Sequence, residues 1–266
     1  TNFVDYSKSI IYSIFFSSNF FFYFSELEYI QYDALLTPFL HTWSLAVEEQ
    51  FYIIFPIFFV TIFRFFKKYL INLLITVSLI SLIFASYLSV IYPSSSFYFI
   101  HTRIWELLLG SILACLEIHK GQRSENKFNN LIFQILGLSL IVFSIIYFDD
   151  TINHPSYLTL IPVAGTSMII WFSQKENFLI RILSSKLFVG IGLISYSLYL
   201  WHYPIFAFFR YLYGSYFEEM IILKIFLIIF SFFLSHFTYN FVEKKFRNPL
   251  FSFKRLKFYL IGLLIL

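Results

Sequence analysis

Long apolar runs restrict the fold of this 266-residue sequence more than any other feature. A transmembrane helix needs about 20 apolar residues to cross about 30 Å of hydrocarbon, and most of the runs approach or exceed that length. They show none of the period-2 alternation that is typical of membrane β-strands, so they indicate helices. The sequence predicts an all-α fold, a polytopic transmembrane helical bundle with eight complete spans and a truncated ninth that begins near residue 259. The eight predicted spans cover residues 9–24, 43–63, 69–91, 101–118, 131–148, 157–172, 188–210 and 220–242.

The composition also favours a lipid environment. Hydrophobic residues make up 59% of the chain and charged residues 13%, whereas soluble domains carry about 25% charged residues. The 39 Phe and 20 Tyr residues bring more apolar surface than one soluble core of this length could bury. The single cysteine, Cys115, excludes an intrachain disulfide and is interpreted as a packing residue inside a helix.

The connections between the predicted spans alternate in charge. Every second connection is basic, and together these connections hold 16 of the 19 Lys and Arg residues; the connections between them hold none. This alternation follows the positive-inside rule and predicts that Lys8 is cytoplasmic, that residues 25–42 lie outside and that residues 243–258 are cytoplasmic. Because the basic residues are sorted by side of a membrane, we do not expect nucleic acid as a partner. Of the other three basic residues, Arg210 and Lys224 lie near outer helix ends, where long basic side chains extend to the interface.

The densest polar cluster opens the second predicted span and contains His41, Trp43, Ser44, Glu48 and Gln50. On a helix, His41, Ser44 and Glu48 share one face, whereas Gln50 lies nearer Trp43. Carboxylates are costly inside a bilayer, so their presence favours a functional site. The same residues also fit a helix N-terminus in the headgroup zone, where the helix dipole favours acids and Trp belongs to the aromatic belt.

A second cluster opens the fourth predicted span. Its Arg103 and Glu106 are three residues apart and can form an ion pair on a helix. An Arg beside a water-filled cavity is also a natural binder of phosphate or carboxylate. The sequence does not decide between an ion pair with Glu106 and an Arg103 that binds an anionic ligand.

The third cluster lies in the seventh predicted span, where Ser195, Tyr199 and His202 form one stripe and Pro204 is expected to kink the helix. His202 is expected roughly 20 Å into the membrane at 1.5 Å per residue, a depth that favours a functional role over a structural hydrogen bond. The predicted topology places all three clusters in the outer half of the bilayer, and so predicts one shared polar cavity. No HExxH, paired-Cys or glycine-rich phosphate-loop pattern is present, so we predict neither a metal site nor a soluble-type nucleotide site.

Four segments, in this order, resemble acyltransferase family 3, the multi-pass O-acyltransferases that modify bacterial surface polysaccharides such as O-antigen and peptidoglycan. In the first motif of that family the positions of Glu48 and Gln50 are characteristic, whereas the position of Glu49 varies. The four segments are HTWSLAVEEQFYIIFP (41–56), RIWELLLGSILA (103–114), SYSLYLWHYP (195–204) and VEKKFR (242–247).

The resemblance implies transfer of an acyl group, usually acetyl from cytoplasmic acetyl-CoA, to a hydroxyl of a cell-surface glycan outside the bacterial cytoplasmic membrane. The expected partners are the lipid bilayer, the acyl-CoA donor and the glycan acceptor, with no tightly bound cofactor. Our hypothesis gives supporting catalytic roles to His41, Glu48 and His202, with Glu48 orienting a partner and Arg103 holding an anionic group. The predicted substrate-binding residues are Trp43, Ser44, Gln50, Arg103, Glu106, Ser195 and Tyr199.

The family is expected to have ten core helices, with the main catalytic His in the first. Counted from the loop charges, the predicted span 9–24 corresponds to the third helix. Residues 1–258 are therefore expected to form a partial acyltransferase domain that lacks this His and is inactive alone. Residues 259–266 are expected to begin a further helix, which in one branch of the family leads to an extracytoplasmic SGNH-hydrolase-like domain.

Two alternatives remain at this stage. A transporter or flippase of a surface glycan or lipid would also place buried charges and a kinked helix in a membrane bundle. An inverted repeat between the halves would favour it, and the sequence shows none. The other alternative is an inactive fragment.

Overall fold

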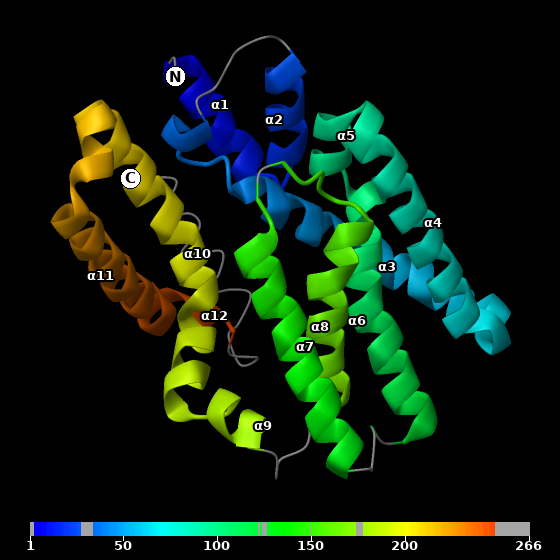
Figure 1. Ribbon diagram of the computed structural model, residues 1–266. Coiled ribbons are helices and arrows are strands. Elements are labelled where there is room, and N and C mark those ends of the chain that lie inside the picture. The colour runs from blue at the N-terminus through cyan, green and yellow to red at the C-terminus, as the bar shows by residue number, and fades with distance from the viewer. Residues whose placement is uncertain are drawn as a thin grey trace. The chain divides into compact units, whose positions relative to one another are not determined.

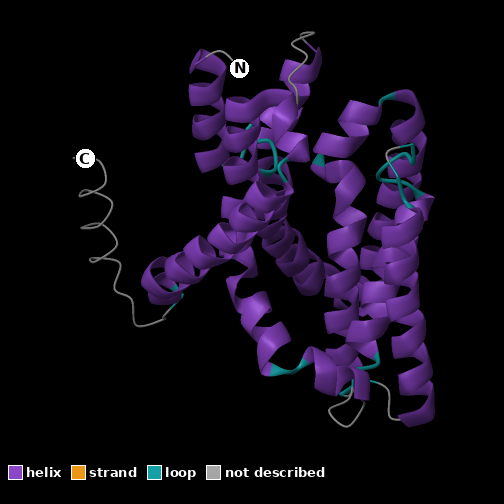
Figure 2. Cartoon of the chain, turned by 60° about the vertical axis from the view of Figure 1, so that its left-hand side comes forward, coloured by secondary structure: helices purple, strands orange, loops and turns teal. Residues whose placement is uncertain are grey.

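The computed structural model describes residues 3–27, 34–121, 123, 127–149, 151–173 and 178–247. These residues form helices and loops and no β-strand (Figures 1 and 2), which confirms the all-α prediction for this part of the chain. The start of the predicted ninth span lies outside the described residues. The chain divides into two compact units, Thr1–Tyr32 with Phe39–Ser184, and Asp33–Pro38 with Ser185–Leu266.

The first unit contains nine α-helices among its described residues. Two helix pairs in this unit pack along each other most extensively, α4 with α6 and α7 with α8. Figure 1 shows α8 between α7 and α6, and both of these contact it. The helices are α1 (Phe3–Ile14), α2 (Ser18–Leu27), α3 (Thr42–Phe66), α4 (Leu70–Ile91), α5 (Pro93–Tyr98), α6 (Ile100–Lys120), α7 (Lys127–Tyr147), α8 (Leu160–Trp171) and α9 (Phe178–Leu183).

The predicted span 9–24 is not one helix, and this prediction was wrong. The chain leaves α1 at Ile14 and re-enters a helix at Ser18, and Phe16 between them adopts a left-handed φ of 51°. The rings of Tyr12 and Phe21 stack with centroids 5.1 Å apart. In a continuous helix nine residues would separate them by roughly 13 Å along the axis, so the chain folds back here. Neither α1 nor α2 is long enough to cross a bilayer alone.

The other predicted spans all coincide with helices, but not all of them qualify as membrane spans. Four helical segments of the described chain are long and apolar enough to cross a membrane, and the first of them, with 50 residues, contains both α3 and α4. The predicted span 157–172 contains only the shorter apolar helix α8, and the predicted span 188–210 is a helix outside the four. The four segments are Thr42–Ile91, Pro93–Lys120, Phe128–Tyr147 and Ile221–Phe246.

Two glycines let α7 and α8 approach closely. A Cβ placed on Gly137 would lie 2.6 Å from the carbonyl oxygen of Gly165, and a Cβ on Gly165 would lie 2.6 Å from the carbonyl oxygen of Gly137. Small residues at such positions are typical of membrane helix pairs, because lipid tails supply no hydrophobic drive and close backbone packing replaces it.

The second unit is built on a long helix pair. Helix α10 (Lys186–Tyr213) continues through Pro204 and packs along α11 (Ile221–Thr238). A π-helix (Tyr239–Glu243) and the short α12 (Lys244–Phe246) follow α11, and η1 (Ala34–Leu36) contacts α10.

A 3₁₀ segment (Gly214–Glu219) joins α10 to α11. In it, Glu218 binds Arg210 at 3.0 Å and Lys224 at 2.7 Å. The two basic residues expected to extend to the interface are therefore ion-paired.

Many large apolar side chains of both units are exposed. Ile222 on α11 is 86% exposed and Ile145 on α7 is 75% exposed, for example. Contiguous apolar surface of this extent marks contact with membrane or partner rather than with water. Together with the four long apolar segments, it indicates a bundle surrounded by lipid.

Candidate functional site

The second polar cluster forms an aromatic cradle around Arg103 in the first unit. The guanidinium carbon of Arg103 lies 5.1 Å from the ring centroid of Trp43 on α3 and 5.1 Å from that of Phe97 on α5. Its Nε donates to the carbonyl oxygen of Phe97 at 3.3 Å, and its Nη1 lies 3.5 Å from Oε1 of Glu106. We call these four residues the Arg103 cradle.

The turn between α5 and α6 creates this geometry. Phe99 is extended, with φ −97° and ψ 147°, so α6 starts in a new direction directly after α5. Thr102 is fully buried, and its hydroxyl donates to the carbonyl oxygen of Ser96 at 2.6 Å, which ties the first turn of α6 back to α5. Arg103, one residue on, is thereby held against Phe97.

The cradle leaves donor capacity for a ligand. A guanidinium carries five N–H donors, of which Nε and Nη1 are engaged here. Within the described part of the chain, Nη2 of Arg103 donates to no protein group. The two neighbouring rings shield one side of a side chain that is 16% exposed, which strengthens its interaction with an anionic or carbonyl oxygen.

Gln50 of the first motif is held by α2, not by the cradle. Its Nε2 donates to Oδ1 of Asn19 at 2.9 Å and to the carbonyl oxygen of Phe16 at 3.1 Å. The fully buried Asn19 in turn donates to the carbonyl oxygen of Tyr98 on α5 at 3.2 Å. One amide pair therefore joins α2, α3 and α5 beside the cradle, because Tyr98 also packs edge-on against Trp43.

The residues at the start of α3 lie beside the α1–α2 turn. Thr42 Oγ1 is 2.8 Å from Ser13 Oγ and 3.0 Å from Ser18 Oγ, so a hydroxyl cluster fastens both short helices to α3. His41 is buried at 8% exposure, and its carbonyl oxygen accepts from Ser44 Oγ at 3.4 Å. Glu48 is half-buried one turn further on.

The third polar cluster lies in the second unit, where Ser195, Tyr199 and His202 of α10 line one pocket of about 380 Å³ against α11. Its walls are otherwise largely apolar, including Phe206 and Ile228. His202 Nδ1 is 3.0 Å from the carbonyl oxygen of Leu198. A carbonyl oxygen only accepts, so Nδ1 carries a proton in this bond.

The third and fourth motif segments are in direct contact. The buried Ser197 donates to Oε2 of Glu243 at 3.0 Å, and Oε1 of Glu243 lies 3.2 Å from Nη1 of Arg247. Glu243 closes the π-helix, a feature that is frequent at functional sites. Glu243 of the fourth motif segment is therefore bonded both to Ser197 of the third segment and to Arg247 of its own segment.

The structure thus groups the predicted residues in two places. Trp43, Arg103 and Glu106 meet in the cradle, with Gln50 fastened beside it; Ser195, Tyr199 and His202 meet in the α10–α11 pocket. The prediction of one cavity shared by all three clusters stays a prediction. Sequence reasoning missed Asn19 and Phe97. A lone amide in a Phe-rich run was the available signal for Asn19, whereas Phe97 acts through its ring and carbonyl and carried no signal.

A model of the acyltransferase domain family matches residues 9–240 of the chain. The chain belongs to this family, acyltransferase family 3. Among its curated relatives, the "Putative peptidoglycan O-acetyltransferase YrhL" of Bacillus subtilis is 32% identical over 263 residues, covering 91% of this chain and 40% of the relative. The "Peptidoglycan O-acetyltransferase OatA" of Listeria monocytogenes is 31% identical over 206 residues, covering 73% of this chain and 33% of the relative.

The chain therefore spans less than half the length of these relatives. No solved structure matches it. Within the described residues, no group of three or more His, Cys, Asp or Glu side chains is arranged to hold a metal ion.

Proposed function

We propose that this domain is the membrane part of an O-acetyltransferase that moves an acetyl group from acetyl-CoA to a hydroxyl of a cell-surface glycan of the peptidoglycan type. Membership of the family and the names of the two relatives support the reaction and the acceptor class. The identity of the acyl donor, the identity of the acceptor and the roles of the reacting residues are all proposed.

The Arg103 cradle is the observation that carries this proposal. It combines Trp43 of the first motif with Arg103 and Glu106 of the second, and it offers unengaged N–H donors in a site shielded from water. Acyl transfer develops negative charge on the carbonyl oxygen, and a preorganised donor that meets this charge typically contributes 10²–10³ in rate. Arg103 supplies such a donor, or binds an anionic group of the donor substrate.

Glu48, His41 and His202 have supporting roles in this proposal. A hydroxyl acceptor must lose its proton as the acyl bond forms, so a general base is required. Glu48 orients such a base or the acceptor, and the ring of His202, held by its Nδ1 bond to the Leu198 carbonyl oxygen, takes a supporting part in the proton transfer. The basic connections around Arg64, Lys120 and Arg181 face the cytoplasm in this proposal, and Arg103 lies toward the opposite side.

The test is acetyl transfer by the intact protein in lipid nanodiscs, with radiolabelled acetyl-CoA and a glycan acceptor. Arg103→Ala and Arg103→Lys are expected to lower kcat by about 10²–10³, because Lys presents no planar fork and stacks poorly on aromatic rings. Glu48→Gln is expected to abolish transfer as well.

Arg181→Ala is the matched control, because Arg181 is exposed on α9 and far in sequence from all motif segments. Its activity is expected to equal that of the wild type. Wild-type rates in Arg103→Lys would remove Arg103 from the reaction. Glycan movement across the bilayer without label transfer would instead favour a transporter.

A further inference from the structure

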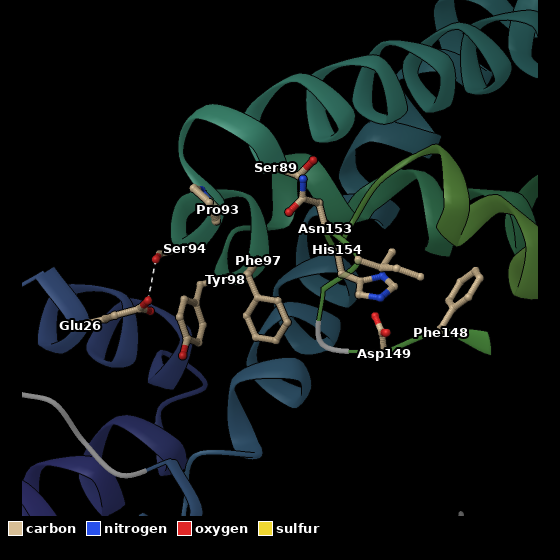
Figure 3. Close-up of a pocket in the computed structure, with 11 residues that line it drawn as sticks. Glu26, Ser89, Pro93, Ser94, Phe97, Tyr98, Phe148, Asp149, Asn153 and His154 are labelled. Atoms are coloured by element: carbon tan, nitrogen blue, oxygen red, sulfur yellow. Dashed lines mark hydrogen bonds between the residues drawn. The ribbon is translucent and has the colours of Figure 1, made fainter. Parts of the chain in front are cut away.

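A second hollow adjoins the cradle, and no prediction from the sequence involved it. It measures about 590 Å³ and is bounded by the end of α2, by α5 and by the loop from α7 to α8 (Figure 3). Glu26 and Ser94 approach each other at one side, with Ser94 Oγ 2.6 Å from Oε1 of Glu26. Asp149 and His154 lie at the other side, and the rings of Phe97 and Tyr98 lie between the two sides. We call this hollow the α5 pocket.

The charge of the α5 pocket excludes an anionic ligand. Two carboxylates, Glu26 and Asp149, line it, and its described lining residues include no Lys or Arg. The hydroxyl and backbone N–H of Thr151 donate to Asp149 and lower the pKa of this carboxyl, which is therefore ionised near neutral pH. Burial lowers the pKa of His154, and the Arg103 guanidinium lowers it further, so the imidazole is neutral there. The pyrophosphate of a coenzyme A thioester would meet two carboxylates in the pocket lining, whereas the guanidinium of Arg103 is not part of that lining and lies against the Phe97 ring.

The remaining chemistry of the pocket suits a sugar chain. Sugar hydroxyls donate hydrogen bonds, and bonds to carboxylates are the stronger, charge-assisted kind. The Asn153 side chain offers both a donor and an acceptor, which matches an N-acetyl group. The half-buried ring of Phe97 lies at the centre of the pocket beside the buried Tyr98 and offers an apolar surface against which the C–H face of a sugar ring packs.

Phe97 connects this pocket to the cradle. The same residue forms part of the pocket lining, packs at a tilt against Trp43 with ring centroids 4.4 Å apart, and accepts the hydrogen bond from Arg103 Nε at its carbonyl oxygen. A ligand resting on Phe97 would therefore lie one ring away from the guanidinium. The positive charge of Arg103 also contributes to the lowered pKa of His154 in the pocket lining, which agrees with the closeness of the cradle to the pocket.

We propose that the α5 pocket binds the acceptor, an uncharged, hydroxyl-rich chain of N-acetylated sugars, and presents one of its hydroxyls toward the Arg103 cradle. The acceptor role rests on the proposed acetyl transfer, whereas sugar binding itself does not. Acyl-CoA then reaches the cradle by a separate route, and donor and acceptor do not compete.

The first experiment measures binding without any transfer. The intact protein in lipid nanodiscs is titrated calorimetrically with a β-1,4-linked pentamer of N-acetylglucosamine. The double variant Asp149→Asn with Asn153→Ala is expected to raise the Kd about tenfold or more, because a charge-assisted bond and an amide contact are lost. The Asn at position 149 retains an oxygen that accepts from Thr151, so the loop conformation is preserved. Glu219→Gln, at an exposed carboxylate of the second unit, is the control and is expected to leave the Kd unchanged.

An unchanged Kd in the double variant would overturn the assignment, as would displacement of the pentamer by coenzyme A. The second experiment measures acetyl transfer to the same pentamer, and the double variant should raise KM for the pentamer while KM for acetyl-CoA stays constant. A wild-type protein that binds the pentamer through these residues but transfers no acetyl group would refute the proposed function and leave the binding site intact. Transfer with an unchanged acceptor KM would refute the pocket alone.

Discussion

The close contact between α7 and α8 permits a quantitative prediction for Gly137→Ala. The added Cβ would lie 2.6 Å from the carbonyl oxygen of Gly165, and 3.1 Å from the Cβ of Met168. Carbon–oxygen contacts between packed helices are normally about 3.3–3.6 Å, so the helices must separate by roughly 0.7–1.0 Å. A gap of that size forfeits about a quarter to a half of the dispersion energy of each neighbouring contact.

The expected cost is about 1–3 kcal/mol, the usual range for overpacking a well-filled interface. Replacing Gly by Ala inside a helix recovers about 1 kcal/mol of propensity, so the net destabilisation relative to the wild type is at most about 2 kcal/mol. For a chain of this size that corresponds to a fall in Tm of at most roughly 8 °C. Gly165→Ala is expected to behave alike, because its Cβ meets the carbonyl oxygen of Gly137 at the same distance.

The assay is thermal unfolding of the intact protein in detergent, followed by intrinsic fluorescence. Gly110→Ala on α6 is the matched control, since its Cβ would meet no atom within 4 Å. That variant gains helix propensity without a clash, and its Tm is expected to equal or exceed that of the wild type. A Gly137→Ala protein as stable as Gly110→Ala would show that the two helices are not in the close contact described.

Three further predictions concern buried polar contacts and pH. Asn19→Ala should lower both Tm and the rate of acetyl transfer, because Gln50 and the Tyr98 carbonyl lose a buried hydrogen-bond partner worth about 1–3 kcal/mol. Asn240→Ala is the control and should change neither quantity, because the Asn240 amide bonds only one turn back, to the carbonyl oxygen of His236. Equal effects of the two variants would contradict the role of Asn19. A double-mutant cycle of Ser197→Ala and Glu243→Ala should give a coupling energy of about 0.6–1.7 kcal/mol from denaturation curves, and strict additivity would mean that their bond is absent in solution. Hydrogen bonds from Lys224 and Arg210 lower the pKa of Glu218, so the stabilisation by this carboxylate is present above its ordinary pKa and is lost as the pH falls through the lowered value. Tm profiles from about pH 7 to pH 3 should therefore converge for wild type and Glu218→Gln at the acidic end, and parallel profiles would contradict this linkage.

The helix positions were largely predictable, because a run of apolar residues dictates a helix wherever lipid leaves backbone groups no other partner. The predictions for α3, α4, α6 and α7 agree with the structure to within a few residues. The first run, 9–24, is short, and the polar residues Ser17, Ser18 and Asn19 at its centre were the local sign that it holds two helices. The turn depends on Phe16 in a left-handed conformation and on contacts of Ser18 and Asn19 with α3, which are long-range contacts.

The turn between α1 and α2 also changes what the charge of Lys8 indicates about the orientation in the membrane. With α1 and α2 folded back on each other, Lys8 no longer precedes a full span, so it does not test the orientation. The basic connections from Arg64 onward still alternate with non-basic ones. These basic connections support the proposed membrane orientation without Lys8.

The candidate site shows the same division between local and long-range information. The spacing of Arg103 and Glu106 allowed an ion pair, and the pair is present; the spacing of Ser195, Tyr199 and His202 predicted a common stripe, and they line one pocket. Periodicity along a single helix determines such relations. The Phe97 ring beside Arg103 and the pocket formed with the α7–α8 loop join separate elements, and no periodicity links those.

The sequence by itself determined that this chain is a helical membrane protein, where most of its helices lie, and, through its four motifs, the family to which it belongs. Those properties follow from hydropathy and from short segments, and both are local. Only the tertiary structure decided that the first apolar run is a folded-back pair, that Gln50 binds Asn19, and that Arg103 lies against two aromatic rings beside an acidic, aromatic pocket. Those properties depend on which faces of different helices meet, and that choice is made by close packing of backbones and buried hydrogen bonds rather than by hydropathy.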